Sequence, residues 1–332
     1  MSDALAPESA FIHDLPPRER SLWRFALTLG VGIVVFLLAT TFTLVAVGLL
    51  YVPLFHWPSP RAPGGLSAML QRFLGLQGSD GRSLDSALQI IGLAIASNVV
   101  PFFAFIGVAV AMGSGSLRAI CTAAARFRWR LLLAGFLLAS ILIGPFMLAD
   151  QWLDPKAGPP PILSVSPEFG VRIFYAAVCA LAFLPAAMGE EILFRGWLLR
   201  QMSNVTHRWA PLMLFNGALF AAAHLDFAPE AFLERWIMGA GFTYMALRLG
   251  GVEFSSGVHF ANNFIIVIFI EPLTLKLSPN TGIDPAALVA NVGLLGGYIL
   301  LAEIVCRWPP MRDWSRAGVA LGSFPWRTRA AV

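Results

Sequence analysis

The stretch PAAMGEEILFRGWLLRQM, residues 185–202, places three charged side chains inside an otherwise apolar segment. Glu190 and Glu191 are adjacent, and Arg195 follows four residues after Glu191. An ionised side chain at the centre of a bilayer costs about 2.5–3.5 kcal/mol on insertion scales, so such residues usually face the interior of a helical bundle. The alternative is that the span ends near Gly189 and that all three charges lie at the membrane interface.

The composition of the whole chain is that of a membrane protein. Of its 332 residues, 57% are hydrophobic and 13% are charged, whereas soluble domains carry about 25% charged residues. Only helices and closed barrels satisfy their backbone groups in lipid, and the apolar stretches here are continuous instead of alternating with period two. We therefore predict an all-α, polytopic transmembrane bundle surrounded by membrane lipid.

Eight apolar segments predict about eight spans. The fifth, sixth and seventh are short, which tilt or burial within the bundle would explain. The segments are 25–51, 86–112, 131–149, 172–199, 210–225, 231–249, 255–271 and 286–306. We divide the chain into an N-terminal region with about three spans (1–171), a candidate catalytic core (172–271), and a last span with a C-terminal tail (272–332).

The distribution of basic residues predicts that both termini are cytoplasmic. With an inside N-terminus, the only basic residues on the outer side are Arg61, Arg72, Arg82, Lys156, Arg172, Arg235 and Lys276. A composition rich in arginine and alanine, with lysine only at 156 and 276, suggests a bacterial inner membrane. The modest net charge of +4 gives no case for nucleic-acid binding. The separated Cys121, Cys179 and Cys306 suggest neither a disulfide framework nor a thiolate zinc site.

The spacing of the three charges predicts different roles for the two glutamates. Glu191 and Arg195 are four residues apart with the acid first, the favourable order for an ion pair on a helix. Glu190 points about 100° away from Glu191 and cannot share that face. We therefore expect Glu191 and Arg195 to support the helix and Glu190 to remain free for chemistry.

Two later segments contain polar residues where apolar ones are expected. His224 ends the helix-forming run FNGALFAAAH, with Phe220 one turn earlier on the same face. An interfacial position beside Asp226 is the alternative for His224. His259 and Asn263 share a face of another predicted helix, where they could stabilise an oxyanion or form a hydrogen bond between helices.

Buried polar groups need partners, so Glu190, His224, His259 and Asn263 are expected to meet. A buried carboxylate beside histidine suits activation of water, and an imidazole with a carboxamide suits stabilisation of the tetrahedral oxyanion. We expect no required cofactor. The alternative is a divalent metal such as zinc held by Glu190, His224 and His259, although the sequence lacks H-E-x-x-H.

Three motifs in this order carry a resemblance. EEILFR (190–195) fits E-E-x-x-x-R, FAAAH (220–224) fits F-x-x-x-H, and HFANN (259–263) fits H-x-x-x-N. Over residues 176–270 the sequence resembles the CPBP family of intramembrane endopeptidases, also called the Abi or CAAX-protease and bacteriocin-processing family. Members are often described as metalloproteases, whereas the branch that trims prenylated CAAX tails works with glutamate and no bound metal.

The resemblance implies a bundle around a cavity open to the cytoplasmic side and a peptide or protein substrate that is prenylated in the CAAX branch. It assigns Glu190 as general base, His224 as its partner in activating water, and His259 with Asn263 as the oxyanion site. Two other classes stay open: a non-catalytic immunity or scaffold protein, and a proton-coupled transporter with Glu190 as relay. The sequence predicts neither the substrate's identity nor the oligomeric state.

One geometric conflict accompanies this hypothesis. Counted at ~1.5 Å per residue from the inner ends of their segments, Glu190 is about 14 Å deep, His224 about 21 Å and His259 about 6 Å. We expect breaks near LPAAMG (184–189) or EFSSG (253–257) to reconcile these depths.

Overall fold

The computed structural model describes residues 10–13, 15, 20–77, 81–153, 158–274, 278 and 282–316. The described residues form helices and no strand, apart from one isolated bridge between Thr122 and Gly251. Within the described ranges, six helices are long and apolar enough to cross a membrane. The predicted all-α, polytopic transmembrane fold is therefore confirmed.

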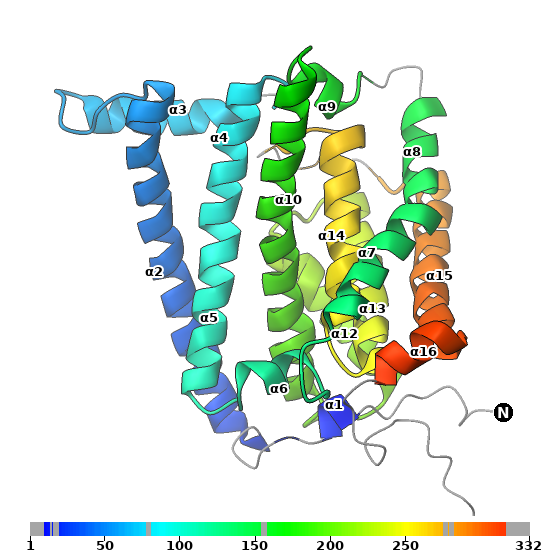
Figure 1. The fold of residues 1–332 in the computed structure, drawn as a ribbon. Helices are drawn as coiled ribbons and strands as arrows, with labels where there is room; N and C mark the ends of the chain where they lie inside the picture. The colour runs from blue at the N-terminus through cyan, green and yellow to red at the C-terminus, as the bar shows by residue number, and fades with distance from the viewer. Residues whose placement is uncertain are drawn as a thin grey trace, which may run out of the picture.

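The chain runs up and down between two ends of the bundle (Figure 1). The six candidate spans are α2 (Leu22–Phe55), α4–η2–α5 (Leu84–Ala111), α7 with α8 (Trp129–Leu142 and Gly144–Leu153), α10–η3–α11 (Phe169–Met202), α14–η4 (Glu253–Ile270) and α15 (Pro285–Arg307). Two further helices, α12 (Trp209–Ala223) and α13 (Pro229–Leu249), form a hairpin. The remaining helices are α1 (Ala10–His13), α3 (Gly65–Gln77), α6 (Leu117–Cys121), α9 (Pro161–Ser164) and α16 (Pro309–Arg316).

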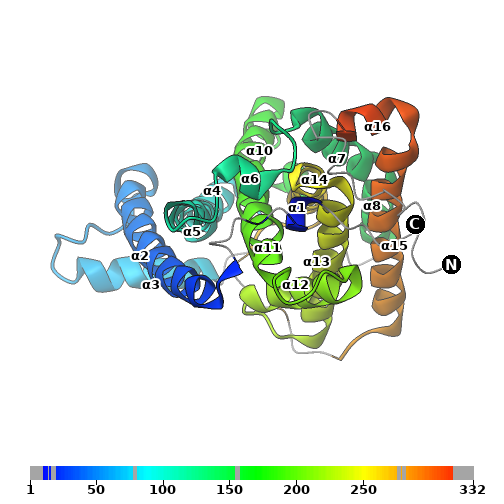
Figure 2. The ribbon, with the colours of Figure 1, turned by 90° about the horizontal axis from the view of Figure 1, so that it is seen from below.

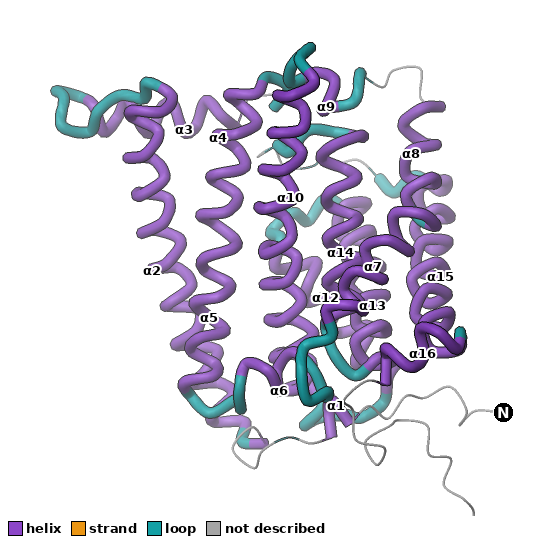
Figure 3. The backbone as a smooth tube through the Cα atoms, viewed as in Figure 1, coloured by secondary structure: helices purple, strands orange, loops and turns teal. Residues whose placement is uncertain are grey.

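Each of the eight predicted apolar segments folds as helix, which the tube of Figure 3 shows in purple. Segments 210–225 and 231–249 become α12 and α13, which are not among the six candidate spans. α12 is too short, and α13 carries Glu230, Glu234, Arg235 and Arg248. The count of about eight spans and the cytoplasmic position of both termini stay predictions.

Several helix-terminal arginines belong to the end of the bundle that carries α1, α6 and α16, which we call the arginine-rich end; Figure 1 shows the position of these helices. Arg118 lies on α6, Arg248 in the last turn of α13 and Arg307 in the last turn of α15. Arg61, in contrast, lies in the connection between α2 and α3 at the opposite end. This distribution is the one that the positive-inside rule associates with a cytoplasmic face.

α14 lies among α7, α10, α13 and α15 when the bundle is seen from the arginine-rich end (Figure 2). Two glycines bring it close to α7: a Cβ on Gly257 would overlap the carbonyl of Leu132, and one on Gly135 would overlap the carbonyl of Phe254. Small residues of this kind allow transmembrane helices to pack backbone against backbone. The motif-bearing α14 is thus held at the centre of the fold.

The expected breaks near LPAAMG and EFSSG are absent. Pro185 lies inside the continuous helix α10 (Phe169–Glu191), and Glu253 is the first residue of α14. The irregular segment comes later, as the π-helical stretch η3 (Ile192–Leu198) directly after Glu191. π-helical turns are rare and occur frequently at functional sites.

Candidate active site

Glu191 and Arg195 form a fully buried ion pair. Their Oε1 and Nη1 atoms are 2.9 Å apart, and both side chains have an exposure of 0%. The helix continues to Met202 through η3 and α11 (Leu199–Met202), well past Gly189. The alternative that the span ends at Gly189 and leaves these charges at the interface is therefore wrong.

The Glu191 carboxylate also fixes His259. Its Oε1 lies 3.1 Å from Nδ1 of His259, a residue of α14 that is 2% exposed. A carboxylate only accepts, so Nδ1 carries a proton and Nε2 is the nitrogen turned toward any reacting group. Glu191 thereby joins α10 to α14 and orients the imidazole.

Arg195 extends the same network to α13 and α12. Its Nη2 donates to the carbonyl oxygen of Gly239 at 2.9 Å. Its guanidinium lies 4.3 Å from the centroid of the Phe220 ring, within the range of a cation–π contact. A Cβ on Gly239 would come within 3.2 Å of Nη2, so the small residue lets the guanidinium approach.

Glu190 has a different environment from Glu191. Its side chain is 13% exposed, and its Oε2 lies 3.8 Å from Nε2 of His259. Within the described part of the chain this buried oxygen has no hydrogen-bond partner. The two glutamates thus flank one imidazole, Glu191 bonded to Nδ1 and Glu190 facing Nε2 with an unsatisfied oxygen.

His224 is the residue that ends α12, and it is exposed. Its Nδ1 lies 2.9 Å from the carbonyl oxygen of Phe220, so Nδ1 donates and Nε2 is left as an acceptor. The His224 ring centroid is 4.8 Å from that of Phe220, and the Phe220 centroid is 5.9 Å from that of His259. His224 also lies within electrostatic range of Glu190 and His259.

Asn263 follows His259 by one turn of α14 and is half-buried. Its Oδ1 accepts a hydrogen bond from Nδ2 of Asn262 at 3.3 Å. No hydrogen bond among the described residues joins it to Glu190, His224 or His259. The structure therefore places both histidine rings against Phe220 and Glu190 beside His259, and relates Asn263 to them through α14 alone.

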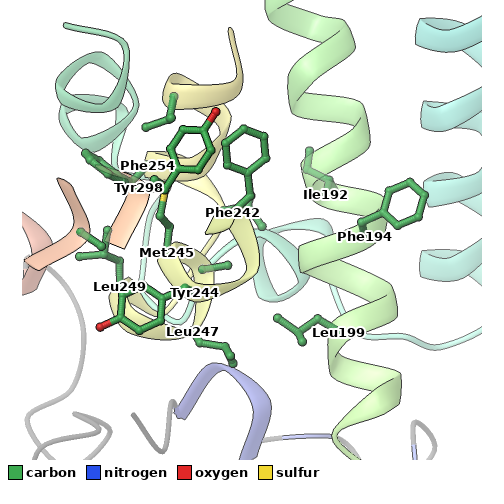
Figure 4. Packing of buried hydrophobic residues seen from close by; sticks show 14 of the residues in the cluster. Ile192, Phe194, Leu199, Phe242, Tyr244, Met245, Leu247, Leu249, Phe254 and Tyr298 are labelled. Atoms are coloured by element: carbon green, nitrogen blue, oxygen red, sulfur yellow. The ribbon is translucent and has the colours of Figure 1, made fainter. Parts of the chain in front are cut away.

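The sequence interpretation missed two contributors from α13. Phe242 packs against His259 with ring centroids 4.9 Å apart, and Gly239 supplies the carbonyl that accepts from Arg195. Figure 4 shows Phe242 among the buried apolar side chains of the core, near Tyr298. The run MGAGF (238–242) was the available signal, because neighbouring glycines in a membrane helix indicate close packing.

The depth conflict has a structural explanation. α14 begins inside the protein, because its first residues, Glu253 and Phe254, are 0% exposed. The segment after α6 covers them: Ala123 donates to the carbonyl of Gly250, and Val252 donates to that of Cys121, each at 2.9 Å. Counting from residue 255, the edge of the predicted apolar segment, therefore underestimates how far His259 lies from the protein surface.

A metal ion has no support from this geometry. The described residues contain no group of three or more His, Cys, Asp or Glu side chains arranged to hold one. Glu190, His224 and His259 thus do not fit the zinc set as they stand, and no step below passes through a metal. Whether the protein needs a divalent metal stays a prediction.

The fold and the site define a polytopic membrane protein with a glutamate–histidine centre inside the bundle. Residues 172–265 match the family model described as type II CAAX prenyl endopeptidase Rce1-like. This match confirms the resemblance to the CPBP family over the segment that carries Glu190, His224, His259 and Asn263.

One curated protein is similar over a longer stretch. The uncharacterized protein YyaK of Bacillus subtilis (strain 168) is 28% identical over 184 residues, which cover 52% of this chain and 60% of the relative. The chain thus matches about three fifths of the relative's length. No solved structure is significantly similar to the chain.

Proposed function

We propose that the protein is an intramembrane endopeptidase that hydrolyses a peptide bond of a membrane-associated substrate. The observation that carries the proposal is the Glu190 carboxylate, which keeps a buried, unbonded oxygen 3.8 Å from Nε2 of His259. A buried polar atom without a partner costs free energy, and a reacting water molecule would supply that partner. The family match supports the reaction class.

The chemistry follows from the atoms that are available. Glu190 takes a proton from water as the water oxygen attacks the carbonyl carbon of the substrate, and the same proton passes to the leaving amine nitrogen when the C–N bond breaks. His224, whose Nδ1–H is occupied by the Phe220 carbonyl, accepts the second water proton in a hydrogen bond through Nε2. This arrangement orients the water without consuming a residue as nucleophile.

The oxyanion of the tetrahedral intermediate forms beside α14. His259 serves it as an imidazolium that donates through Nε2, and the Glu191 carboxylate at Nδ1 stabilises that positive charge. The Asn263 amide, one turn further along α14, is the second donor. Arg195 keeps Glu191 ionised and fixed in place.

We propose a lipidated peptide of the CAAX type as the substrate class. The matching family model describes type II CAAX prenyl endopeptidases, and the site lies in a bundle whose outer surface is apolar. A substrate anchored in the same membrane reaches such a site by lateral diffusion. A prenyl chain supplies that anchor.

The first experiment compares cleavage of a farnesylated CAAX reporter peptide by the wild-type protein and by Glu190→Gln in lipid nanodiscs. We expect the substitution to lower the cleavage rate by about 10²–10⁴-fold, the range for loss of a general base. Glu168→Gln, at an exposed residue before α10, is the matched control and should cleave normally. Cleavage retained in a well-folded Glu190→Gln protein would remove the proposal and favour a scaffold.

A second experiment with a metal chelator tests whether cleavage requires a bound metal ion. Wild-type protein treated with 1,10-phenanthroline should keep its activity, because every step above uses the chain's own residues. Activity that is lost on treatment and restored by zinc would replace this mechanism with the metal-dependent one.

A further inference from the structure

Leu225, the residue after His224, has a backbone conformation that leucine rarely adopts. Its φ is 55°, in the left-handed region, and His56 is the only other described non-glycine residue with positive φ. It occupies the position after a helix end where glycine is the usual residue. Its side chain is 72% exposed, so packing of that side chain does not explain the strained backbone.

Asp226 holds the strained residue in place. Its side chain is buried within the protein, with an exposure of only 6%. Its Oδ2 accepts from Nη1 of Arg235 at 3.0 Å, and from the hydroxyl and amide of Ser278 at 2.8 and 3.3 Å. Its Oδ1 lies 3.4 Å from the amide nitrogen of Ala228. The carboxylate is therefore bonded to its own loop, to α13 and to the connection between α14 and α15.

These contacts act on the site through one residue. Leu225 is the only residue between Asp226 and His224, so fixing Asp226 and the left-handed turn fixes the exit of the chain from α12. The His224 ring is itself tied to the Phe220 carbonyl at 2.9 Å. Local strain persists where surrounding structure over-determines it, and such strain clusters at functional sites.

We propose that Asp226, Arg235 and Ser278, acting through the left-handed Leu225, form a positioning lock that holds the His224 ring toward Glu190 and His259. The lock rests on the proposed hydrolytic function, because it acts on the histidine that orients water there. Asp226 is a positioning residue in this account, since it does not touch the reacting atoms.

The first test separates the backbone of Leu225 from its side chain. Asn and Gly tolerate a left-handed conformation, whereas the β-branched Val resists it. Leu225→Asn and Leu225→Gly should therefore cleave the farnesylated peptide at close to the wild-type rate, and Leu225→Val should lose at least tenfold in kcat with little change in KM. The opposite order, with Val active and Asn and Gly raised in KM, would overturn the lock and make the exposed leucine a substrate contact.

The second test removes the charge at Asp226. Asp226→Asn and Arg235→Gln should each lower kcat at least tenfold without raising KM, and the double variant should lose little more than either one. Ser278→Ala, which keeps the backbone amide bond, should have a smaller effect. Glu230→Gln, at an acid in the first turn of α13, is the matched control and should have no effect.

A third readout does not depend on activity. In protein labelled with ¹⁵N-histidine, the His224 ring should give the signal of a fixed Nδ1–H tautomer, assigned through its loss in His224→Gln. In Asp226→Asn and Leu225→Val, the His224 signal should become an average over several ring orientations and tautomers. In Leu225→Gly it should stay that of the fixed Nδ1–H tautomer. An unchanged His224 signal in folded Asp226→Asn would overturn the lock. If the wild-type protein cleaves no peptide but the signal responds as expected, the proposed function fails and the lock stands.

Discussion

Glu190 and Glu191 are neighbours in the chain, but their carboxylates have different partners. Glu191 is fully buried and bonds to both Arg195 and His259. Glu190 remains slightly exposed and has no hydrogen bond to a described residue, whereas Glu191 leaves only its Oε2 unbonded. The cause is the rotation of about 100° per residue along a helix, which turns one side chain into the bundle and the other toward the site.

This difference predicts that substitutions of the two glutamates change stability by very different amounts. Glu191→Gln leaves the buried Arg195 guanidinium uncompensated and should lower the free energy of unfolding by about 3–5 kcal/mol. Glu190→Gln breaks no hydrogen bond and should change it by less than about 1 kcal/mol. Denaturant unfolding in detergent, followed by tryptophan fluorescence, measures both. Equal losses in the two variants would contradict the division of roles.

For individual residues, the sequence predicted the contacts between side chains on the same helix. The Glu191–Arg195 spacing indicated an ion pair, and Phe220 was placed on the face of His224. The bond between Glu191 and His259 joins residues that are 68 positions apart, and the spacing of residues along one helix cannot predict a contact between two helices. The burial of Asp226 was missed for the same reason, because Ser278 lies 52 residues away.

Two glycines set the distance between α7 and α14. Gly257→Ala would press a methyl group against the backbone of Leu132, and such overpacking costs about 1–3 kcal/mol. It should also lower cleavage, because His259 is two residues further along α14. Gly293→Ala on α15 is the control: nothing lies within 4 Å of its added Cβ, so the helix should gain stability. Thermal unfolding of both variants tests this prediction, because the unfolding temperature should fall for Gly257→Ala and rise for Gly293→Ala.

The start of α14 is clasped by Arg128, the residue that precedes the neighbouring helix α7. Arg128 donates through Nε and Nη2 to the two carboxylate oxygens of Glu253 at 2.9 and 2.8 Å, and both side chains are buried. Arg128 also donates to the carbonyl of Leu249, the last residue of α13. The clasp keeps the connection after α6 closed over α14.

Cys121 reports whether this clasp is closed. Burial, aided by the Glu253 carboxylate, raises the pKa of its thiol to about 12, so almost no thiolate exists at pH 8. With Cys179 and Cys306 replaced by Ala, Cys121 should react with N-ethylmaleimide far more slowly than a free cysteine, and faster only as the pH approaches 12. Arg128→Ala should open the connection and raise the rate. Rapid labelling of the parent protein would contradict the buried position.

Helix existence was predictable from the apolar segments, while helix ends were not. The apolar pattern stops at residue 199, but charged and polar residues continue the helix to Met202, where α6 supplies a partner: Arg200 donates to the carbonyl of Ala119, a residue of α6. The depth estimate failed because it treated each apolar boundary as a membrane boundary. Burial by a neighbouring loop cannot be inferred from composition.

Across the whole molecule, the arginine-rich end predicts the orientation in the membrane. Arg61→Cys, in the connection between α2 and α3, should be labelled by a membrane-impermeant maleimide in intact cells. Arg126→Cys, exposed at the opposite end, should be labelled only after permeabilisation. The parent protein gives the background from its own cysteines. The reverse pattern would place both ends of the chain outside.

The π-helical stretch η3 has a consequence for changes in the length of its helix. Its hydrogen bonds close over five residues instead of four, so it accommodates a residue that is surplus to a regular α-helix. Trp197, near the end of η3, donates to Ser114 at 3.1 Å, and Arg200, which follows η3, donates to Ala119 at 2.7 Å. Removing the surplus residue would turn these two side chains by about 100° while leaving Glu190 in place. The part of the helix before η3 is therefore oriented by the contacts of the site, and the part after it by contacts with the surrounding helices. The number of residues in η3 determines the rotation between these two parts, and so allows both sets of contacts to form.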